Sequence, residues 1–381
     1  MIAKGILILG GVLFLYAFLS LIRPLALRWW WKMLLCLPLG ATAFKYTLLH
    51  VLCGGSFFRP AVPMWLDLLS LWLFMGLIIT VAGLLVLDLV RLPFRLFLGR
   101  KPWWRSFRNR VNGVLLLAAL GLTAWGMHQA FALPQVRKIT ISLPRLQVPV
   151  RLAMLTDLHA DRYKQADFFR EVVNRTNALQ VDAVVITGDF QDGHPYELAP
   201  ALAPLRDLKS RWGTFAVSGN HDYFTRPNAW HRYLSSLGIR FLDNAHVLPG
   251  PGHLVLTGIT DPAATRGNST PPDITRALQS APAGKPVVLL AHQPGVWNTT
   301  ARHGVDLQLS GHTHGGHAPG LRHLIAHFNE GLVQGLYHKG NTQLYISNGT
   351  SLWSGFPLRL GTPAEITLIT LVPEQKQAEK Q

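Results

Sequence analysis

The sequence predicts an N-terminal α-helical membrane bundle followed by an α/β domain, and two observations support this division. First, 49% of the 381 residues are hydrophobic and only 15% are charged, whereas about a quarter of a typical soluble chain is charged. Second, the long apolar runs stop at Pro134, and shorter runs separated by Gly, Pro, Asn and Asp follow. Such punctuation is typical of strands joined by turns.

Four apolar stretches predict the bundle, because each is close to the roughly 20 residues that a helix needs to cross a membrane. They are residues 5–22, 34–53, 66–90 and 112–133. Lys45 lies near the middle of the second stretch, so a buried core helix is the alternative there. Lys45 has two equally good interpretations. It is either a charge with a function inside the membrane or a side chain that faces a neighbouring helix. A signal peptide is the alternative for the first stretch, but no small-residue cleavage site precedes Arg23.

The positive charge is concentrated in the apolar third of the chain. Residues 1–135 carry 13 lysines and arginines but only two acidic residues, Asp67 and Asp88, within a chain of net charge +16. Basic residues beside apolar segments orient helices in a membrane, so no nucleic-acid partner is expected. Seven basic residues lie in 91–110 beside two tryptophans, which is typical of a segment at the membrane surface.

The basic loops also predict which side of the membrane each part occupies. The turns after the first and third stretches are rich in Lys and Arg, and the turn after the second has Arg59 alone. Basic loops stay in the cytoplasm, so the termini and the α/β domain are expected outside. Four basic residues after the fourth stretch weaken this contrast: Arg137, Lys138, Arg145 and Arg151. The two cysteines, Cys36 and Cys53, are too few for a disulfide framework.

We expect a linker at 134–148, the α/β domain at 149–372 and a polar tail at 373–381. Several of the apolar runs are continuous, as in strands covered on both faces. The expected strands are 150–156, 182–188, 214–219, 253–259, 286–291, 305–310, 343–348 and 365–371. The expected helices are 165–179, 196–211 and 227–237.

Polar motifs with metal-ligand residue types follow five of these strands. They are "TDLH" (156–159), "GDFQD" (188–192), "GNHD" (219–222), "AHQP" (291–294) and "GHTHGGH" (311–317). Each motif alone is also explained as a turn or a cap. Because α/β sheets bind ligands beyond the carboxyl ends of their strands, the joint occurrence favours one shared site. Carboxylate, amide and imidazole ligands without thiolate suit Mn, Fe or Zn.

These motifs resemble those of the calcineurin-like metallophosphoesterases over residues 149–371. The "GITDP" at 258–262 and the closing "LYISNGTSLWSGFPLRLGTPAEITLITL" are similar to the bacterial branch with hydrophobic N-terminal segments. The resemblance implies a two-sheet αββα sandwich and two divalent metal ions, with Asp189 shared between them. It implies Asp157, His159, Asp189 and His314 as ligands of one ion, and Asp189, Asn220, His292 and His312 as ligands of the other.

The remaining polar residues of the motifs receive other roles. The resemblance implies that His221 binds no metal and instead contacts the substrate phosphate or protonates the leaving group. We expect Asp222 to orient an imidazole and His317 to contact a ligand or the substrate. Solvated loop carboxylates are the preferred interpretation of Asp161 and Asp192. Three more histidines, in a stretch of uncertain structure at 318–340, are expected at the surface: His323, His327 and His338.

The expected function is therefore a membrane-anchored phosphoesterase with a dinuclear metal site. The resemblance implies hydrolysis of a phosphate ester or pyrophosphate by a hydroxide shared between the metals, with a lipid headgroup as one candidate substrate. A membrane scaffold or transporter with a metal-binding domain is one alternative, and a nuclease or nucleotide phosphodiesterase is another. The expected location is the bacterial inner membrane, with several spans and the catalytic domain on the periplasmic face.

Overall fold

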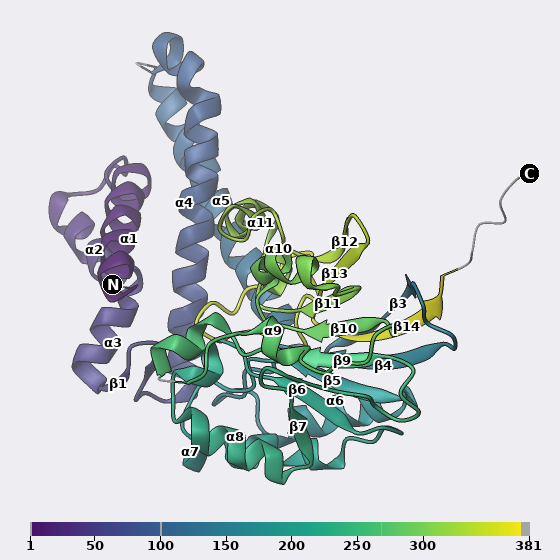
Figure 1. The fold of residues 1–381 in the computed structure, drawn as a ribbon. Helices are drawn as coiled ribbons and strands as arrows, with labels where there is room; N and C mark the ends of the chain where they lie inside the picture. Colours follow the sequence, from purple (N-terminus) through teal and green to yellow (C-terminus); the bar gives the residue numbers. More distant parts are fainter. Residues whose placement is uncertain (1, 100, 268, 375–381) are drawn as a thin grey trace, which may run out of the picture. The chain divides into compact units, whose positions relative to one another are not determined.

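A computed structural model describes residues 2–99, 101–267 and 269–374 (Figure 1). The chain divides into two compact units. The first consists of Met1–His128 together with Gly355–Leu358, and the second consists of Gln129–Ser354 and Arg359–Gln381.

Within the residues that the structure describes, three helices are long and apolar enough to cross a membrane. They are α1 (Ile2–Ala17) with the π turn that follows it, α4 (Met64–Leu98) and α5 (Pro102–Phe131). The side chain of Trp72 on α4 donates a hydrogen bond to the carbonyl of Leu120 on α5 at 2.9 Å. The segment 91–110 is largely helical, because α4 and α5 both extend into it.

The second expected span is not one straight helix. Helix α2 (Trp29–Ala43) meets α3 (Lys45–Cys53) at an angle of 82°. The described residues therefore contain the four predicted spans only if this bent pair counts as one span. The chain bends at Phe44, whose φ of −106° and ψ of 19° interrupt the helix. Directly after the bend, Lys45 lies 3.6 Å from Asp67, and both side chains are buried. Lys45 therefore faces a bundle neighbour, which compensates its charge.

Two six-stranded sheets form the second unit within the described residues. One has the order β3-β14-β4-β5-β6-β7, and the other has the order β12-β13-β11-β10-β9-β8. The strands of the first are β3 (Gln135–Leu143), β4 (Val150–Leu155), β5 (Ala183–Thr187), β6 (Thr214–Val217), β7 (Ile239–Phe241) and β14 (Glu365–Pro373). Those of the second are β8 (Ala245–Val247), β9 (Val255–Gly258), β10 (Val287–Leu290), β11 (Leu307–Ser310), β12 (Gly335–Lys339) and β13 (Thr342–Ile346).

The central strands, such as β5, β6, β9 and β11, are buried on both faces, which explains their continuous apolar runs. Val185 of β5 and Val288 of β10 belong to the core between the two sheets. Their neighbours Val184 and Leu289 belong to outer cores instead, since successive side chains of a strand point to opposite faces.

Helices cover both outer faces, so the layers follow the order α, β, β, α. On one side lie α6 (Ala166–Asn177), α7 (Pro195–Leu202) and α8 (Pro227–Ser236), and on the other lie α9 (Ile274–Ala277) and α10 (Trp297–Thr300). All eight expected strands are present in the two six-stranded sheets, which also contain four further strands, β3, β7, β8 and β12.

The stretch 134–148, expected to be a linker, contains the nine-residue strand β3. It pairs in parallel with β14 along its whole length. The sequence carried a signal for it, because Ile139, Ile141 and Leu143 alternate with polar residues, and the last two are fully buried. Helix α5 ends at Phe131 and β3 begins at Gln135, so only three residues connect the last apolar helix to the sheet.

Candidate metal centre

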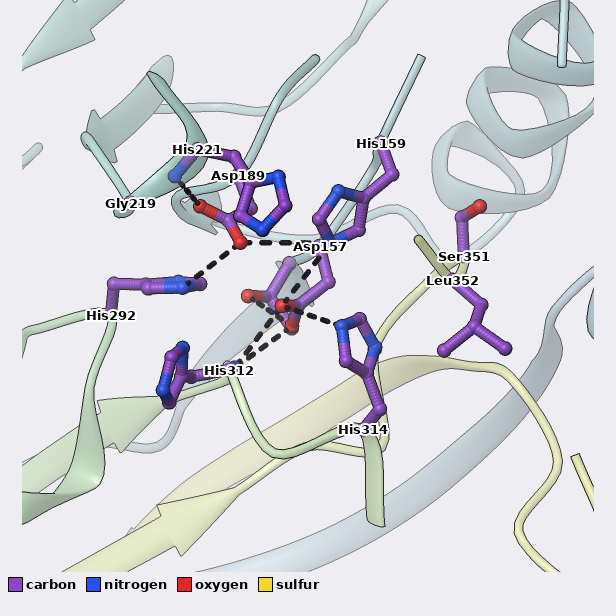
Figure 2. A network of polar contacts seen from close by, with 12 residues as sticks. Asp157, His159, Asp189, Gly219, His221, His292, His312, His314, Ser351 and Leu352 are labelled. Carbon is purple, nitrogen blue, oxygen red and sulfur yellow. Dashed lines mark hydrogen bonds and ion pairs between the residues drawn. The ribbon is translucent and has the colours of Figure 1, made fainter. Parts of the chain in front are cut away.

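The five polar motifs converge because the strands before them are parallel within each sheet. Strands β4, β5 and β6 are parallel neighbours, and so are β10 and β11. Figure 2 shows the side chains that follow these strands pointing toward one another. The carboxyl ends of the strands therefore build one site, as the motifs predicted.

Two buried carboxylates, Asp157 and Asp189, lie at the centre of this site. Asp157 is fully buried and Asp189 is 2% exposed. The Nε2 atom of His314 lies 3.6 Å from Asp157 Oδ1, and the Nε2 atoms of His159 and His292 lie 3.6 and 3.2 Å from Asp189 Oδ2. Three groups have ligand atoms mutually within 4.8 Å: Asp157, His159 and His314; Asp157, Asp189 and His292; and His159, Asp189 and His221.

The two remaining predicted ligands lie beside His292. The side-chain oxygen of Asn220 is 3.2 Å from His292 Nε2, and the rings of His292 and His312 are 5.1 Å apart. The backbone N–H of His312 donates to both carboxylate oxygens of Asp157, at 3.1 and 3.2 Å. The structure thus brings all seven predicted metal ligands into one cluster.

The backbone in these loops is strained. Five of the predicted ligands adopt a positive φ, which is uncommon for residues other than glycine. They are Asp157 (53°), His159 (44°), Asp189 (57°), His312 (74°) and His314 (50°). Strain of this kind gathers at functional sites, where the surrounding structure holds it.

Two glycines allow the carboxylates to approach closely. A Cβ atom on Gly219 would lie 2.2 Å from Asp189 Oδ1, and a Cβ on Gly311 would lie 2.3 Å from Asp157 Oδ2. Because these gaps are far shorter than van der Waals contact, any other residue would displace a carboxylate.

The hydrogen-bonding atoms fit a cation at this site. The Nδ1 atom of His292 lies 2.7 Å from the carbonyl oxygen of Thr187, which only accepts, so Nδ1 carries a proton and donates. Nε2 then faces Asp189 and Asn220 oxygens, which are also acceptors. His159 Nε2 is likewise buried with no hydrogen-bond partner among the described residues. Acceptors that face acceptors require a positive charge between them, either a proton or a metal ion.

The electrostatics of the cluster agree with this requirement. Burial raises the pKa of Asp157. Burial also acts to raise the pKa of Asp189, but the charges of His292, His221 and His159 outweigh it and hold the pKa well below its usual range. Burial, with the charge of His292, lowers the pKa of His312 to about 3. The neutral imidazole of His312 and the ionised carboxylate of Asp189 are ligand types that suit a divalent cation.

Asp222 has a different role from the expected one. Its carboxylate accepts hydrogen bonds from the backbone N–H groups of Asp189 (2.9 Å), Phe190 (2.9 Å) and Gly219 (2.8 Å). It therefore orients the backbone of the Asp189 loop, and the prediction that it orients an imidazole was wrong. Burial, together with the charge of Asp189, raises its pKa to about 7.

Asp192 is a site residue that the sequence analysis missed. The prediction of a solvated carboxylate was wrong, because its side chain is only 10% exposed. Both oxygens lie 3.1 Å from His159 Nδ1, and Oδ1 lies 2.6 Å from His221 Nδ1. Burial acts to lower the pKa of His221, but Asp189 and Asp192 outweigh it and raise the pKa to about 9. The signal for Asp192 was its place in "GDFQD", three residues after Asp189.

Asp161 was also expected to be solvated, and this too was wrong. It is 2% exposed, and its carboxylate lies 2.9 Å from the ammonium group of Lys164. It also accepts hydrogen bonds from two backbone N–H groups, so it shapes the turn after His159. Asp161 is a structural residue of the loop.

The closing segment contributes a second residue that was missed, Arg359. Its guanidinium is fully buried and donates to the backbone carbonyls of Asn348 (2.8 Å), Ser351 (2.5 Å) and Thr362 (3.0 Å). Ser351 in turn donates its backbone N–H to the Asp157 carbonyl at 3.1 Å. Arg359 therefore fixes the loop that packs against the first metal-ligand motif.

The other histidines are divided between the site and the surface. His317 is 9% exposed, and its ring lies 5.3 Å from that of His314. His323 and His327 on α11 (Pro319–Phe328) and His338 on β12 are exposed, as predicted.

A layered pair of sheets with Asp, His and Asn side chains clustered at its strand ends is an arrangement suited to binding metal ions. Residues 150–316 match the family model described as calcineurin-like phosphoesterase. An uncharacterized metallophosphoesterase of Helicobacter pylori is 36% identical over 274 residues, covering 71% of this chain and 73% of that protein. The chain belongs to the calcineurin-like metallophosphoesterase family, which confirms the resemblance of the motifs.

Two further relatives show the range of this similarity. An uncharacterized metallophosphoesterase of Campylobacter jejuni is 31% identical over 259 residues, covering 68% of each chain. A Danio rerio protein named "Transmembrane protein with metallophosphoesterase domain" is 32% identical over 280 residues, covering 70% of this chain and 63% of that protein.

Replacing Asp192 tests its contact with the two imidazoles. We expect Asp192→Ala to lower kcat/KM by about 10- to 100-fold, since groups that orient metal-ligating histidines have effects of this size. The measurement is hydrolysis of a chromogenic phosphodiester with added manganese. Asp167→Ala, which removes a carboxylate that is 97% exposed, is the control and should change little. A wild-type rate in Asp192→Ala would contradict the assignment.

Proposed function

We propose that the chain is a membrane-anchored phosphoesterase that uses two divalent metal ions. The observation that carries the proposal is the arrangement around Asp189, where His292 Nε2 faces the Asp189 and Asn220 oxygens. The other ring nitrogen, Nδ1, already donates to the Thr187 carbonyl. The family relationship supports phosphoester hydrolysis, and the apolar helices support attachment to a membrane. The catalytic domain in this proposal spans residues 149–372, preceded by β3.

The proposed ligands divide into two sets that share Asp189. Asp157, His159, Asp189 and His314 would hold one ion, and Asp189, Asn220, His292 and His312 would hold the other. When bound, such a pair supplies Lewis acidity, which lowers the pKa of water and neutralises phosphate oxygens. The neutral Asn220 limits the negative charge that faces an anionic substrate. The family does not decide between Mn, Fe and Zn.

His221 is the proposed proton donor. Its Nδ1 is held by Asp192, and its backbone N–H donates to Asp189 Oδ1 at 2.8 Å. The ring is 17% exposed and contacts Phe224 and Trp353, whose ring centroids are 4.8 and 5.8 Å away. These contacts fix the ring so that Nε2–H can reach a leaving-group oxygen. His221 also belongs to a group with metal-ligand spacing, so the division of roles needs a direct test.

Replacing Asp189 and His221 separates metal binding from proton donation. Asp189→Ala should abolish turnover and lower the metal content, because it removes a ligand from both ions. His221→Ala should keep both metals and lose about 10²- to 10⁴-fold in kcat, the contribution typical of a general acid. Elemental analysis and single-substrate kinetics measure the two effects, with the exposed His323→Ala as the control. If His221→Ala lost as much metal as Asp189→Ala, His221 would be a ligand instead.

We infer that the substrate carries its phosphate or pyrophosphate on a lipid. Helix α11 begins at Pro319, two residues after His317, so it follows the "GHTHGGH" loop directly. It exposes two large apolar side chains, Leu324 (53%) and Phe328 (75%). Exposed apolar residues beside a phosphate site suit acyl chains. The alternative is a soluble substrate, with the helices serving only as an anchor.

The lipid hypothesis predicts a change in substrate preference. Each apolar side chain that contacts an acyl chain contributes about 1.5–3 kcal/mol. Leu324→Ser with Phe328→Ser should therefore lower the ratio of lipid-phosphate to chromogenic phosphodiester hydrolysis at least about tenfold. The matched control is Tyr196→Ser on α7, which removes another exposed aromatic side chain. An unchanged ratio would favour the anchor alternative.

We also propose that the chain lies in the bacterial inner membrane with its catalytic domain in the periplasm. Arg23, Arg28 and Lys32 follow α1, and basic residues surround the turn between α4 and α5, so both loops suit the cytoplasmic side. The second loop has Arg59 alone. The same rule places the end of α5, and the domain after it, outside.

Cysteine labelling in intact cells tests this orientation. In a background with Cys36→Ser and Cys53→Ser, Ser280→Cys adds one exposed thiol to the catalytic domain. An impermeant reagent should label it without lysis, whereas Lys101→Cys at the α4–α5 turn should react only after the membrane is broken. The reverse pattern would place the catalytic domain in the cytoplasm.

A further inference from the structure

An arginine-lined cavity of about 770 Å³ lies within the helical unit, distant in sequence from the metal-site motifs. It is formed where the end of α1 and the turn after it meet α4 and α5. Four arginines line it, together with one carboxylate, Asp88. The arginines are Arg23, Arg91, Arg105 and Arg108.

The described lining of the cavity contains more arginines than carboxylates. Asp88 is the one carboxylate among its described lining residues. It already accepts a hydrogen bond from the hydroxyl of Tyr16 at 2.8 Å, and it lies 3.7 Å from Arg91 Nη1. Four guanidinium groups beside one engaged carboxylate form a site for an anion.

Arg91 is buried with part of its guanidinium unsatisfied. The residue is 9% exposed, and Nη1 donates to the side-chain oxygen of Asn112 at 2.7 Å. Nη2 is buried and has no hydrogen-bond partner among the residues that the structure describes. An unpaired donor on a buried charge is costly, so a ligand with acceptor oxygens would stabilise it.

Neighbouring contacts hold the cavity wall in place. The amide nitrogen of Asn112 donates to the carbonyl of Ser20 at 3.0 Å, which fixes the group that Arg91 contacts. The Nε and Nη2 atoms of Arg105 donate to the carbonyl of Pro24 at 3.0 and 2.7 Å. Arg91 and Arg105 are therefore positioned by contacts with residues 20–24 before any ligand binds, which lowers the entropy lost on binding.

One wall of the same cavity is apolar and reaches the exposed surface of the helices. Leu85, Leu89 and Leu92 of α4 line it, and they are 46%, 72% and 57% exposed. On a helix long and apolar enough to cross a membrane, such leucines contact lipid chains. A wall that changes from arginine to exposed leucine suits a molecule with an anionic head and hydrocarbon tails.

We propose that this cavity binds the phosphate group of an anionic phospholipid, with the acyl chains along the leucines of α4. The arginines supply charge-assisted hydrogen bonds to the phosphate oxygens, and Arg91 Nη2 gains its missing acceptor. Basic pockets between membrane helices recognise lipid headgroups by this chemistry. The proposal is independent of the phosphoesterase activity, because it uses only residues of the helical unit.

Native mass spectrometry of the full-length protein in detergent tests the site. The probes are a phosphatidylglycerol, a phosphatidylcholine of the same chains, and inorganic phosphate. We expect one phosphatidylglycerol to bind at least about tenfold more tightly than phosphatidylcholine. Equal affinity for the two lipids would overturn the proposal. Displacement of phosphatidylglycerol by inorganic phosphate at equal concentration would show that the site takes the free anion and not a lipid.

Arginine variants locate the binding to the cavity. Arg91→Gln and Arg108→Gln should each weaken phosphatidylglycerol binding at least about tenfold, the effect expected for losing a hydrogen bond to a charged group. The control is Arg110→Gln. Arg110 lies on α5, as Arg108 does, but it does not line the cavity, so this variant should bind phosphatidylglycerol as the wild type does. Equal weakening by Arg110→Gln would mean general surface attraction. If Arg91→Gln fails to fold, Arg105→Gln replaces it, and circular dichroism with size-exclusion chromatography in detergent reports folding.

Discussion

The catalytic unit depends on one electrostatic constraint, the burial of Asp157 and Asp189 side by side. Two carboxylates removed from water are unfavourable unless positive charge lies beside them. The nearby imidazoles supply it only in part, because burial, with the charge of His292, lowers the pKa of His312 and keeps that ring neutral. In the proposed function, a pair of divalent ions would meet the requirement, and the proposed ligands already lie together. The positive φ angles of the loops and the close approach at Gly219 and Gly311 are the structural consequences of bringing these groups together.

Backbone hydrogen bonds offset the strain that this arrangement imposes. The Asp222 carboxylate holds the Asp189 turn by three backbone N–H groups, and buried Arg359 holds the loop against Asp157 by backbone carbonyls. Neither side chain is a predicted metal ligand. Both act on the conformation of loops that carry ligands, so the ligand geometry is set before any metal binds.

The motifs at the strand ends allowed the cluster of Asp, His and Asn side chains to be predicted, because residue type and strand order are both visible in the sequence. The roles of Asp192 and Arg359 were missed since they depend on which atoms meet in space, two imidazoles for one and backbone carbonyls for the other. Strand β3 was missed because its outer positions are polar and its partner β14 lies more than 200 residues away. The bend at Phe44 was missed because the apolar run continues through it, although Lys45 marked the place.

The metal content of the purified full-length protein tests the central claim most directly. Loaded with manganese, the wild-type chain should hold two metal equivalents by elemental analysis. Its electron paramagnetic resonance spectrum should show two coupled ions, since a shared carboxylate places them roughly 3.5 to 4 Å apart. One equivalent per chain, or two equivalents with the spectrum of isolated ions, would contradict the shared site at Asp189.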